Sequence, residues 1–294
     1  MRRLRALEPL AWIGPAVVLI VVVVLWPVVE MIRSSFLKIS RVGVVRGYNG
    51  FDNYEKLFAE KDFADIMVRS VIWVVAVVVL TVVISLALAQ LFNQRFPGRK
   101  IARWALIAPW AASVLMTAIV FRWMLDPEVG VINQIRLRLG LIDALGGASA
   151  DQLGDASTAM PWLVFVAVFV SIPFTTYALL AGLATIPADV YEAAKMDGAS
   201  RLRTYWSITL PLLRPALTVA VLINMMNVFN SFPIIWAMTH GQPGYSTATS
   251  TIFMFILKSS DIGESAAMSV VNFGMVLVIT AVFLKISRWN RAVA

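Results

Sequence analysis

The polar side chains best placed to contact a solute are neutral amides and hydroxyls inside an apolar segment. The sequence NMMNVFNSF puts Asn224, Asn227 and Ser231 at i, i+3 and i+7, on one face of a helix, with Asn230 beside them. Such groups both donate and accept hydrogen bonds, so this face suits a polyhydroxylated solute better than an ion. The alternative is that these amides only join neighbouring helices. Further candidates of this kind, in an earlier apolar segment, are Ser171, Thr175 and Tyr177.

Covalent and metal chemistry have little support in the composition. The chain has no cysteine and one histidine, which excludes a thiolate nucleophile, a cysteine metal site and a histidine cluster. No G-x-x-x-x-G-K-[ST] stretch occurs, so the chain has no P-loop with which to bind ATP. We therefore expect no catalytic residue, no metal site and no cofactor bound by this chain.

The elements that carry these side chains are long apolar segments. Hydrophobic residues make up 60% of the 294 residues and charged residues 14%, whereas soluble domains are about half apolar and about a quarter charged. A helix needs about 20 apolar residues to cross a bilayer. The sequence therefore predicts an all-α integral membrane protein, one membrane domain over residues 1–294, with six spans at about 11–29, 66–91, 104–125, 160–184, 211–238 and 266–286.

The charges indicate how the spans are oriented. With the N-terminus in the cytoplasm, the inner loops receive fourteen of the 25 basic residues and only four of the 17 acidic residues. The positive-inside rule then places both termini in the cytoplasm. The first span resembles a signal sequence, but no small-residue cleavage site follows it, so we expect an uncleaved anchor. Because the basic residues are scattered among short loops, they do not indicate a nucleic-acid partner.

One cytoplasmic stretch, YEAAKMDGASRLRTYWSITLP, interrupts the apolar pattern between the fourth and fifth spans. Asp189 and Glu192 suit the first turns of a helix, and Gly198 can take the left-handed conformation that ends one. A second short helix from about Ser200 would run to Pro211, where the next span opens. Such a helix, break and helix can dock in the groove of a partner protein or rest on lipid headgroups.

The same stretch resembles the EAA motif of permease subunits in bacterial binding-protein-dependent ABC importers. The pattern E-A-A-x3-G-x9-I-x-L-P is matched at every fixed position, by Glu192, Ala193, Ala194, Gly198, Ile208, Leu210 and Pro211. The wider sequence looks most like the carbohydrate and glycerol phosphate branch (MalF/UgpA-like), and the resemblance extends through GFDNYEKLF and DPEVGVIN. One departure is THGQP at residues 239–243, where that branch usually reads T-x-G-G-P.

The resemblance implies a type I ABC importer permease fold in a bacterial inner membrane, with residues 187–210 as cytoplasmic coupling helices. Glu192 and Gly198 would contact an ATPase subunit, and Asp197 would cap or pair locally. The implied partners are a second, related permease, two ATP-binding cassette subunits that carry ATP and Mg, and an external solute-binding protein. The chain itself would be a transport subunit for a sugar or sugar-like solute and not an enzyme.

Two other classes of function stay open on the residues alone. An ion-driven carrier would place ionisable groups near the bilayer midplane, but the middle of every predicted span lacks Asp, Glu, Lys and His. A membrane enzyme would need clustered acids, whereas the acids of residues 52–65 alternate with lysines like a solvated loop. Arg122, near the outer end of the third span, is expected to pair with Asp126, and His240 to be solvated in an outer loop.

Overall fold

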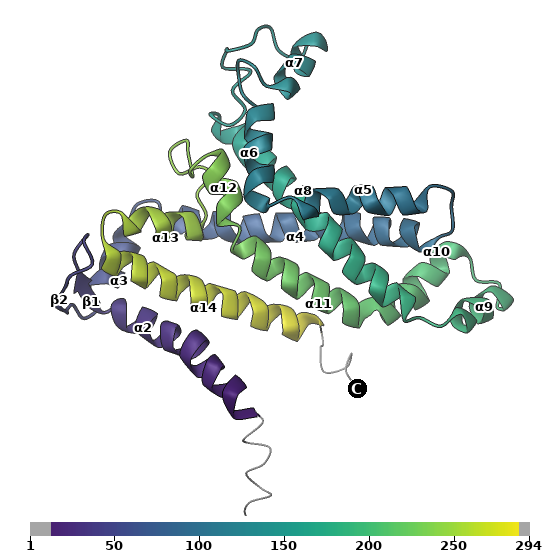
Figure 1. Ribbon diagram of the computed structural model, residues 1–294, viewed down its shortest axis with the longest axis horizontal. Helices are drawn as coiled ribbons and strands as arrows, with labels where there is room; N and C mark the ends of the chain where they lie inside the picture. The colour runs from purple at the N-terminus through teal and green to yellow at the C-terminus, as the bar shows by residue number, and fades with distance from the viewer. Residues whose placement is uncertain (1–12, 288–294) are drawn as a thin grey trace, which may run out of the picture. The chain divides into compact units, whose positions relative to one another are not determined.

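The structure is a computed structural model and describes residues 13–287 (Figure 1). Five of its helices are long and apolar enough to span a membrane: Ile13–Ser34, Phe63–Asn93, Ala156–Ala184, Arg201–Met238 and Ile262–Ser287. They confirm five of the six predicted spans; the expected start of the first, at residue 11, lies outside the described residues. Two compact units make up the chain, Met1–Ala64 with Phe253–Met275, and Asp65–Ile252 with Val276–Ala294. The single domain expected from the sequence stays a prediction.

The third predicted span is the one that the structure corrects. Residues 104–125 do not form one helix but belong to two, α5 (Arg99–Ala111) and α6 (Val114–Met124). Ala112 and Ser113 between them have extended backbone, which breaks the helical hydrogen-bond ladder. The residues on both sides of the break are apolar or small, so hydropathy alone could not reveal it.

The fifth span is also interrupted. Its part after the EAA stretch consists of α11 (Leu210–Phe229) and α12 (Phe232–Met238), separated at Asn230 and Ser231. Carbonyl groups at such a break need donors, because the bilayer core supplies no water. Trp73, on α4 (Phe63–Asn93) and almost fully buried, gives its indole N–H to the Val228 carbonyl at 3.0 Å and to the Ser231 hydroxyl at 3.2 Å.

Close packing of α8 (Ala156–Ala184) on α11 forms the core of the second unit. Gly182 makes this approach possible: a methyl group there would overlap the Cβ of Ala216 and come within 2.8 Å of Leu213 Cδ1. Small residues allow two helices in a membrane to approach closely in this way. At the other end of α8, the Asp155 side chain accepts from the Ser157 N–H as an N-cap.

The first unit contains η1 (Ile20–Leu25) and α2 (Trp26–Ser34), which together form most of the first span, and an outer segment that is not all helical. A two-stranded antiparallel hairpin, β1 (Leu37–Ile39) with β2 (Val45–Tyr48), departs from the all-α prediction, and α3 (Asp52–Ala59) follows it. The strands pair Lys38 with Gly47 and continue past a bulge to Ile39 and Val45. Whether a 17-residue loop forms such a hairpin depends on its turn residues. The pattern of long apolar segments, from which the spans were predicted, does not indicate it.

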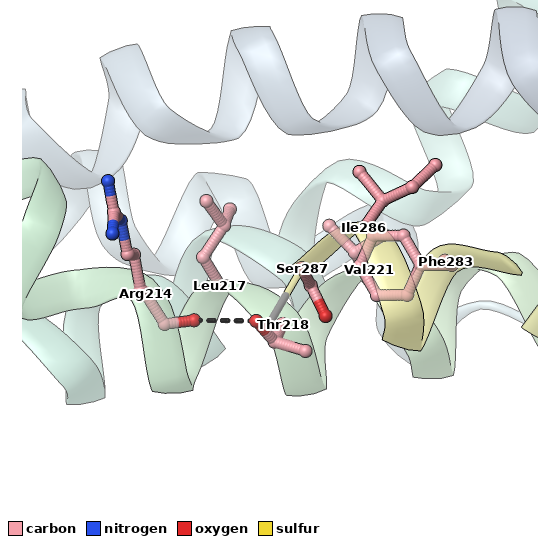
Figure 2. A pocket seen from close by; sticks show the side chains of 7 residues that line it. All are labelled: Arg214, Leu217, Thr218, Val221, Phe283, Ile286 and Ser287. Carbon is pink, nitrogen blue, oxygen red and sulfur yellow. Dashed lines mark hydrogen bonds between the residues drawn. The ribbon is translucent and has the colours of Figure 1, made fainter. Parts of the chain in front are cut away.

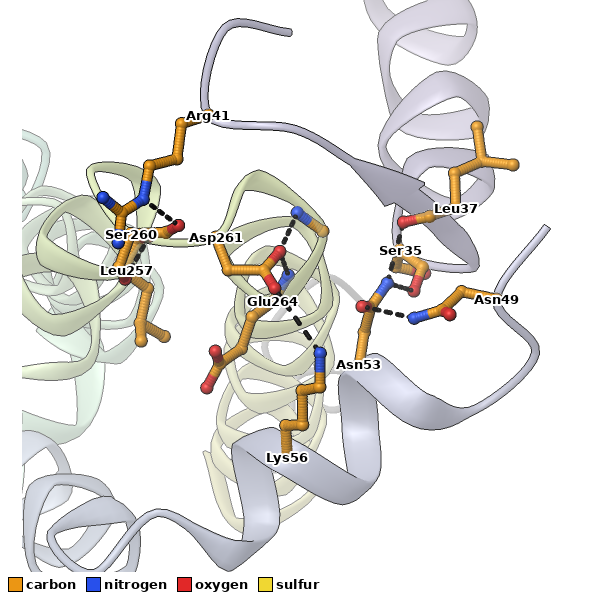
Figure 3. Close-up of polar contacts among 11 residues, drawn as sticks. Ser35, Leu37, Arg41, Asn49, Asn53, Lys56, Leu257, Ser260, Asp261 and Glu264 are labelled. Atoms are coloured by element: carbon orange, nitrogen blue, oxygen red, sulfur yellow. Dashed lines mark hydrogen bonds and ion pairs between the residues drawn. The ribbon is translucent and has the colours of Figure 1, made fainter. Parts of the chain in front are cut away.

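Asn53 is the centre of this outer segment (Figure 3). It is almost fully buried and donates to the carbonyls of Ser35 at 2.8 Å and Leu37 at 3.0 Å, while its own carbonyl oxygen accepts from Asn49. Gly263, near the start of α14 (Ile262–Ser287), packs against the same side chain. An ion pair of 3.7 Å between Lys56 and Asp261 and a bond from Arg41 to the Ser260 carbonyl hold the same region.

The other outer segments also contain short helices, α7 (Val131–Arg138) and α13 (Ser250–Lys258). Buried Asn133 organises the first of them by donating to the carbonyls of Leu125, Asp126 and Ala150. In the second unit, Arg69 donates to the Tyr245 carbonyl at 2.6 Å and so holds the loop before α13. These segments are therefore ordered by side chains that bind backbone carbonyls.

Candidate coupling loop and translocation cavity

The EAA stretch forms the predicted helix, break and helix. The first helix is α9 (Ala188–Met196), with Pro187 at its N-cap and Asp189 in its first turn. Gly198 has φ of +71°; its N–H bonds to the Lys195 carbonyl and the Ala199 N–H to the Ala194 carbonyl. This pair of bonds is the Schellman arrangement, which requires a left-handed residue. The prediction that Gly198 ends the helix in that conformation is confirmed.

Exposure divides the motif residues of α9 into two groups. Glu192, Ala193, Asp197 and Gly198 are exposed. Ala194 is only 5% exposed, so its methyl group packs inside the chain. Met196, at the end of the helix, is 88% exposed, so its side chain is accessible to a partner.

The second half of the stretch leads into the membrane segment without a gap. Ser200 caps α10 (Arg201–Thr204) by accepting from the Arg203 N–H, and a π-helical turn, η2 (Tyr205–Thr209), joins it to α11. The remaining motif residues, Ile208, Leu210 and Pro211, lie half-buried in this junction. From Arg201 onward, α10, η2 and α11 therefore form continuous helix, and α9 is joined to it by the short turn at Gly198.

A cavity of about 500 Å³ lies at the two helix interruptions of the second unit. The breaks at Ala112 and at Asn230 both face it, as does the middle of α8. Irregular backbone at membrane depth is tolerated where it lines a cavity, and transporters build solute sites from such discontinuous helices. The lining residues are Trp110, Ala112, Val114, Ala167, Val170, Ser171, Phe174, Thr175, Asn224, Asn227, Val228, Asn230, Ser231, Pro233 and Ile234.

The structure brings the predicted amides together here. Asn224, Asn227, Asn230 and Ser231 all line the cavity, and none of the described residues that line it is charged. Asn224 is 2% exposed, and its amide nitrogen has no hydrogen-bond partner among the described residues. A buried donor without a partner costs about 1–3 kcal/mol, so a solute that accepts this hydrogen bond would recover that energy.

Other predicted polar residues are engaged in the structure itself. The Ser231 hydroxyl donates to the Val228 carbonyl, the Asn230 amide to the Met226 carbonyl and the Thr175 hydroxyl to the Ser171 carbonyl. Tyr177 is not among the residues that line the cavity; its hydroxyl donates to the Arg103 carbonyl at 3.0 Å. The structure therefore gives no support to a place for Tyr177 on the solute path.

Two tryptophans were missed because their surroundings hide them in the sequence. Trp73 lies in the run VIWVVAVVVL, and its indole N–H donates to the Val228 carbonyl at the break in the fifth span. Trp110 precedes the break between α5 and α6 and lines the cavity with Phe174. From sequence alone, a single aromatic residue in an apolar run is expected to be an ordinary packing residue. Its role at a helix break becomes visible only when the position of the break is known.

Arg122, Asp126 and His240 have ionisable side chains and differ in their surroundings. Arg122 donates to the Ala237 carbonyl at 3.0 Å, and among the described residues no ion pair joins it to Asp126, so that expected pair is wrong. Asp126 accepts instead from the N–H groups of Val129 and Glu128, which hold the pKa of its carboxyl below the usual range. His240 is exposed, as expected.

Comparison with known protein families identifies the family of this chain. The family described as binding-protein-dependent transport system inner membrane component matches residues 81–291, which include the EAA loop and both interrupted spans. The chain belongs to this family. It is therefore a multi-pass permease of the inner membrane and a transport component, not an enzyme.

Relatives of this permease match along nearly its full length. A probable ABC transporter permease of Brucella suis biovar 1 is 39% identical over 281 residues, covering 95% of this chain and 96% of the relative. The sulfoquinovosyl glycerol transport system permease SmoG of Agrobacterium fabrum is 31% identical, covering 94% and 89%. The trehalose/maltose transport system permease MalF of Thermococcus litoralis is also 31% identical, covering 94% and 92%.

A solved structure gives the fold of this permease. A chain in the crystal structure of a bacterial ABC transporter involved in the import of the acidic polysaccharide alginate superposes with a TM-score of 0.83 at 20% identity. The match covers 98% of this permease and 99% of that chain. The permease therefore has the fold of an ABC importer membrane subunit.

Proposed function

We propose that this permease is the translocation subunit of an ATP-driven importer for a neutral sugar or sugar-like solute. The observation that carries the proposal is the cavity at the two helix breaks. Its polar side chains are amides and hydroxyls, it has no charged lining residue, and it contains the unsatisfied Asn224 donor. Hydroxyl groups of a sugar accept and donate such hydrogen bonds.

The named relatives support this solute class. Their names refer to sulfoquinovosyl glycerol, trehalose and maltose, diacetylchitobiose, and sn-glycerol-3-phosphate, all of which carry two or more hydroxyl groups. An anionic solute among these would be bound best by a site that contains a basic side chain. Because no residue that lines this cavity is basic, a neutral solute fits it better than an anionic one.

Energy would come from partner subunits. Two ATP-binding cassette subunits would hold ATP and Mg, and one of them would dock on the exposed face of α9, formed by Glu192, Ala193, Met196 and the Gly198 turn. Closure of the two subunits would move α9 and, through the Gly198 turn, the continuous helix of α10, η2 and α11, whose last turns line the cavity. A second, related permease would complete the path, and an external binding protein would deliver the solute. Both termini would lie in the cytoplasm.

Reconstitution tests the proposal. The permease and the subunits that copurify with it are placed in proteoliposomes, and the copurifying binding protein is screened to choose a neutral sugar that it retains. Uptake of that sugar should require ATP on the side of the ATPase subunits and binding protein on the other side. Collapse of proton and sodium gradients should leave uptake unchanged. Gradient-driven uptake without ATP would instead identify an ion-coupled carrier.

A further inference from the structure

Two adjoining cavities on the second unit differ in polarity. The first, of about 350 Å³, lies between α11 and the end of α14 and has Arg214 in its lining. The second, of about 460 Å³, lies between α4, α11 and α14 and has almost no polar surface. Val221, Phe283 and Ile286 line both, so the two cavities are neighbours along these side chains. The surface formed by the two together is called the lipid groove below.

The polar end of the lipid groove is formed by Arg214, Thr218 and Ser287 (Figure 2). Arg214 is exposed, and within the described residues its guanidinium makes no ion pair. The two hydroxyls beside it already donate, Thr218 to the Arg214 carbonyl at 2.9 Å and Ser287 to the Leu284 carbonyl at 3.1 Å. What this end offers to a ligand is therefore the positive charge of Arg214 and the remaining lone pairs of two hydroxyls.

The two cavities together have about the length of one leaflet. Along α11 their lining extends from Arg214 to Met225, which at 1.5 Å per residue is about 16 Å. Half of a hydrocarbon core of about 30 Å is about 15 Å. The other walls of the apolar cavity include six valines of α4 between Val74 and Val83 and, on α14, Val278, Ile279, Val282 and Phe283.

We propose that the lipid groove binds one anionic phospholipid of the leaflet next to the EAA loop. Its phosphate would bind the Arg214 guanidinium, which matches phosphate geometry and charge, and one acyl chain would follow the valines. A transmembrane helix of a partner subunit is the competing occupant. Helix ends on the cytoplasmic side carry basic residues, which would place like charges beside Arg214, so charge favours the lipid.

Native mass spectrometry of the full chain, with the subunits that copurify, tests this site. Phosphatidylglycerol and phosphatidylcholine are added in equal amounts. Wild type should retain one phosphatidylglycerol in preference to phosphatidylcholine, and Arg214→Gln should lower that retention about tenfold because a charge-assisted contact is lost. Arg95→Gln is the matched control, since it replaces another exposed arginine, in the loop before α5. Equal retention in Arg214→Gln and Arg95→Gln would overturn the proposal, as would equal retention of the two lipids by wild type.

A second experiment separates the lipid from a partner helix. Val282→Phe fills the apolar wall without changing charge, and should also reduce retained phosphatidylglycerol. A photoreactive benzoylphenylalanine in place of exposed Val278 should capture phospholipid when the complex is irradiated in the membrane. Capture of a permease subunit at that position would show that a helix occupies the groove and would contradict the proposal. The inference requires only that the chain lies in a bilayer, so it does not depend on the transported solute.

Discussion

At the scale of single residues, the buried asparagines fall into two kinds that the sequence cannot separate. Asn53 and Asn133 are fully engaged with backbone carbonyls and hold loops. Asn224 is equally buried but its amide nitrogen has no partner among the described residues. A donor that contributes nothing to the fold and faces a cavity is expected to serve a ligand.

The matched substitutions Asn224→Leu and Asn53→Leu should therefore have opposite effects on stability. Asn224→Leu removes an unsatisfied donor, so the midpoint of thermal unfolding in detergent should stay the same or rise. Asn53→Leu leaves the Ser35 and Leu37 carbonyls without their donor and should destabilise by about 1–3 kcal/mol. If Asn224→Leu destabilised as strongly as Asn53→Leu, Asn224 would be a packing residue.

Sequence reasoning predicted the amide face because a 3.6-residue spacing is visible in NMMNVFNSF. It could not predict the hydrogen bond from the Trp73 indole N–H to the Val228 carbonyl, because the two residues are 155 positions apart in the sequence. The EAA pattern names Ala194 beside Glu192 and Ala193, but the sequence of a nine-residue helix does not say which side packs on the chain, and Ala194 is buried.

At the scale of elements, glycines mark where helices touch or end. Gly182 of α8 meets Ala216 and Leu213 of α11, whereas Gly274 of α14 has no heavy atom within 4 Å of an added Cβ. Both are helical, so Gly→Ala changes backbone entropy alike at the two positions. Only the contact with the neighbouring helix differs.

Gly182→Ala should destabilise the permease by about 1–3 kcal/mol because its methyl group overpacks the contact between α8 and α11. Gly274→Ala should be neutral or stabilising by about 0.5–1 kcal/mol, as expected for an uncrowded helical glycine. Thermal unfolding followed by size-exclusion chromatography measures both. Equal effects of the two substitutions would show that α8 and α11 do not pack as described.

The turn after α9 gives a test of the coupling element. Gly198→Pro fixes φ near −65°, far from the observed +71°, and removes the N–H that bonds to Lys195. It should abolish association of the ATPase subunits while membrane insertion is retained. Gly198→Asn is the control, because asparagine tolerates the left-handed conformation and should retain most of the association. Normal copurification with Gly198→Pro would remove the docking role from this turn.

At the scale of the whole molecule, the sequence predicted the features that depend on long apolar segments. It did not predict local breaks within those segments. Five apolar spans and the helix, break and helix of the EAA loop were predicted. The interruptions at Ala112 and Asn230 were not, because apolar residues continue across them. The cavity depends on those interruptions, so its residues were predicted only in part.

The orientation of α9 toward a partner can be tested with engineered cysteines, because the chain has none of its own. Met196→Cys, at a site 88% exposed, should form a crosslink to an ATPase subunit in the assembled complex. Ala194→Cys, at a buried site on the same helix, should not. Crosslinks from both positions, or from neither, would refute the proposed docking face.

The most direct test of the central claim is sugar uptake by the reconstituted complex with Asn224→Leu. The account predicts normal assembly and binding of the ATPase subunits, with uptake of the neutral sugar lowered about tenfold, the value of one lost buried hydrogen bond to the solute. Unchanged uptake in a correctly assembled Asn224→Leu complex would contradict the assignment of this cavity to the solute path.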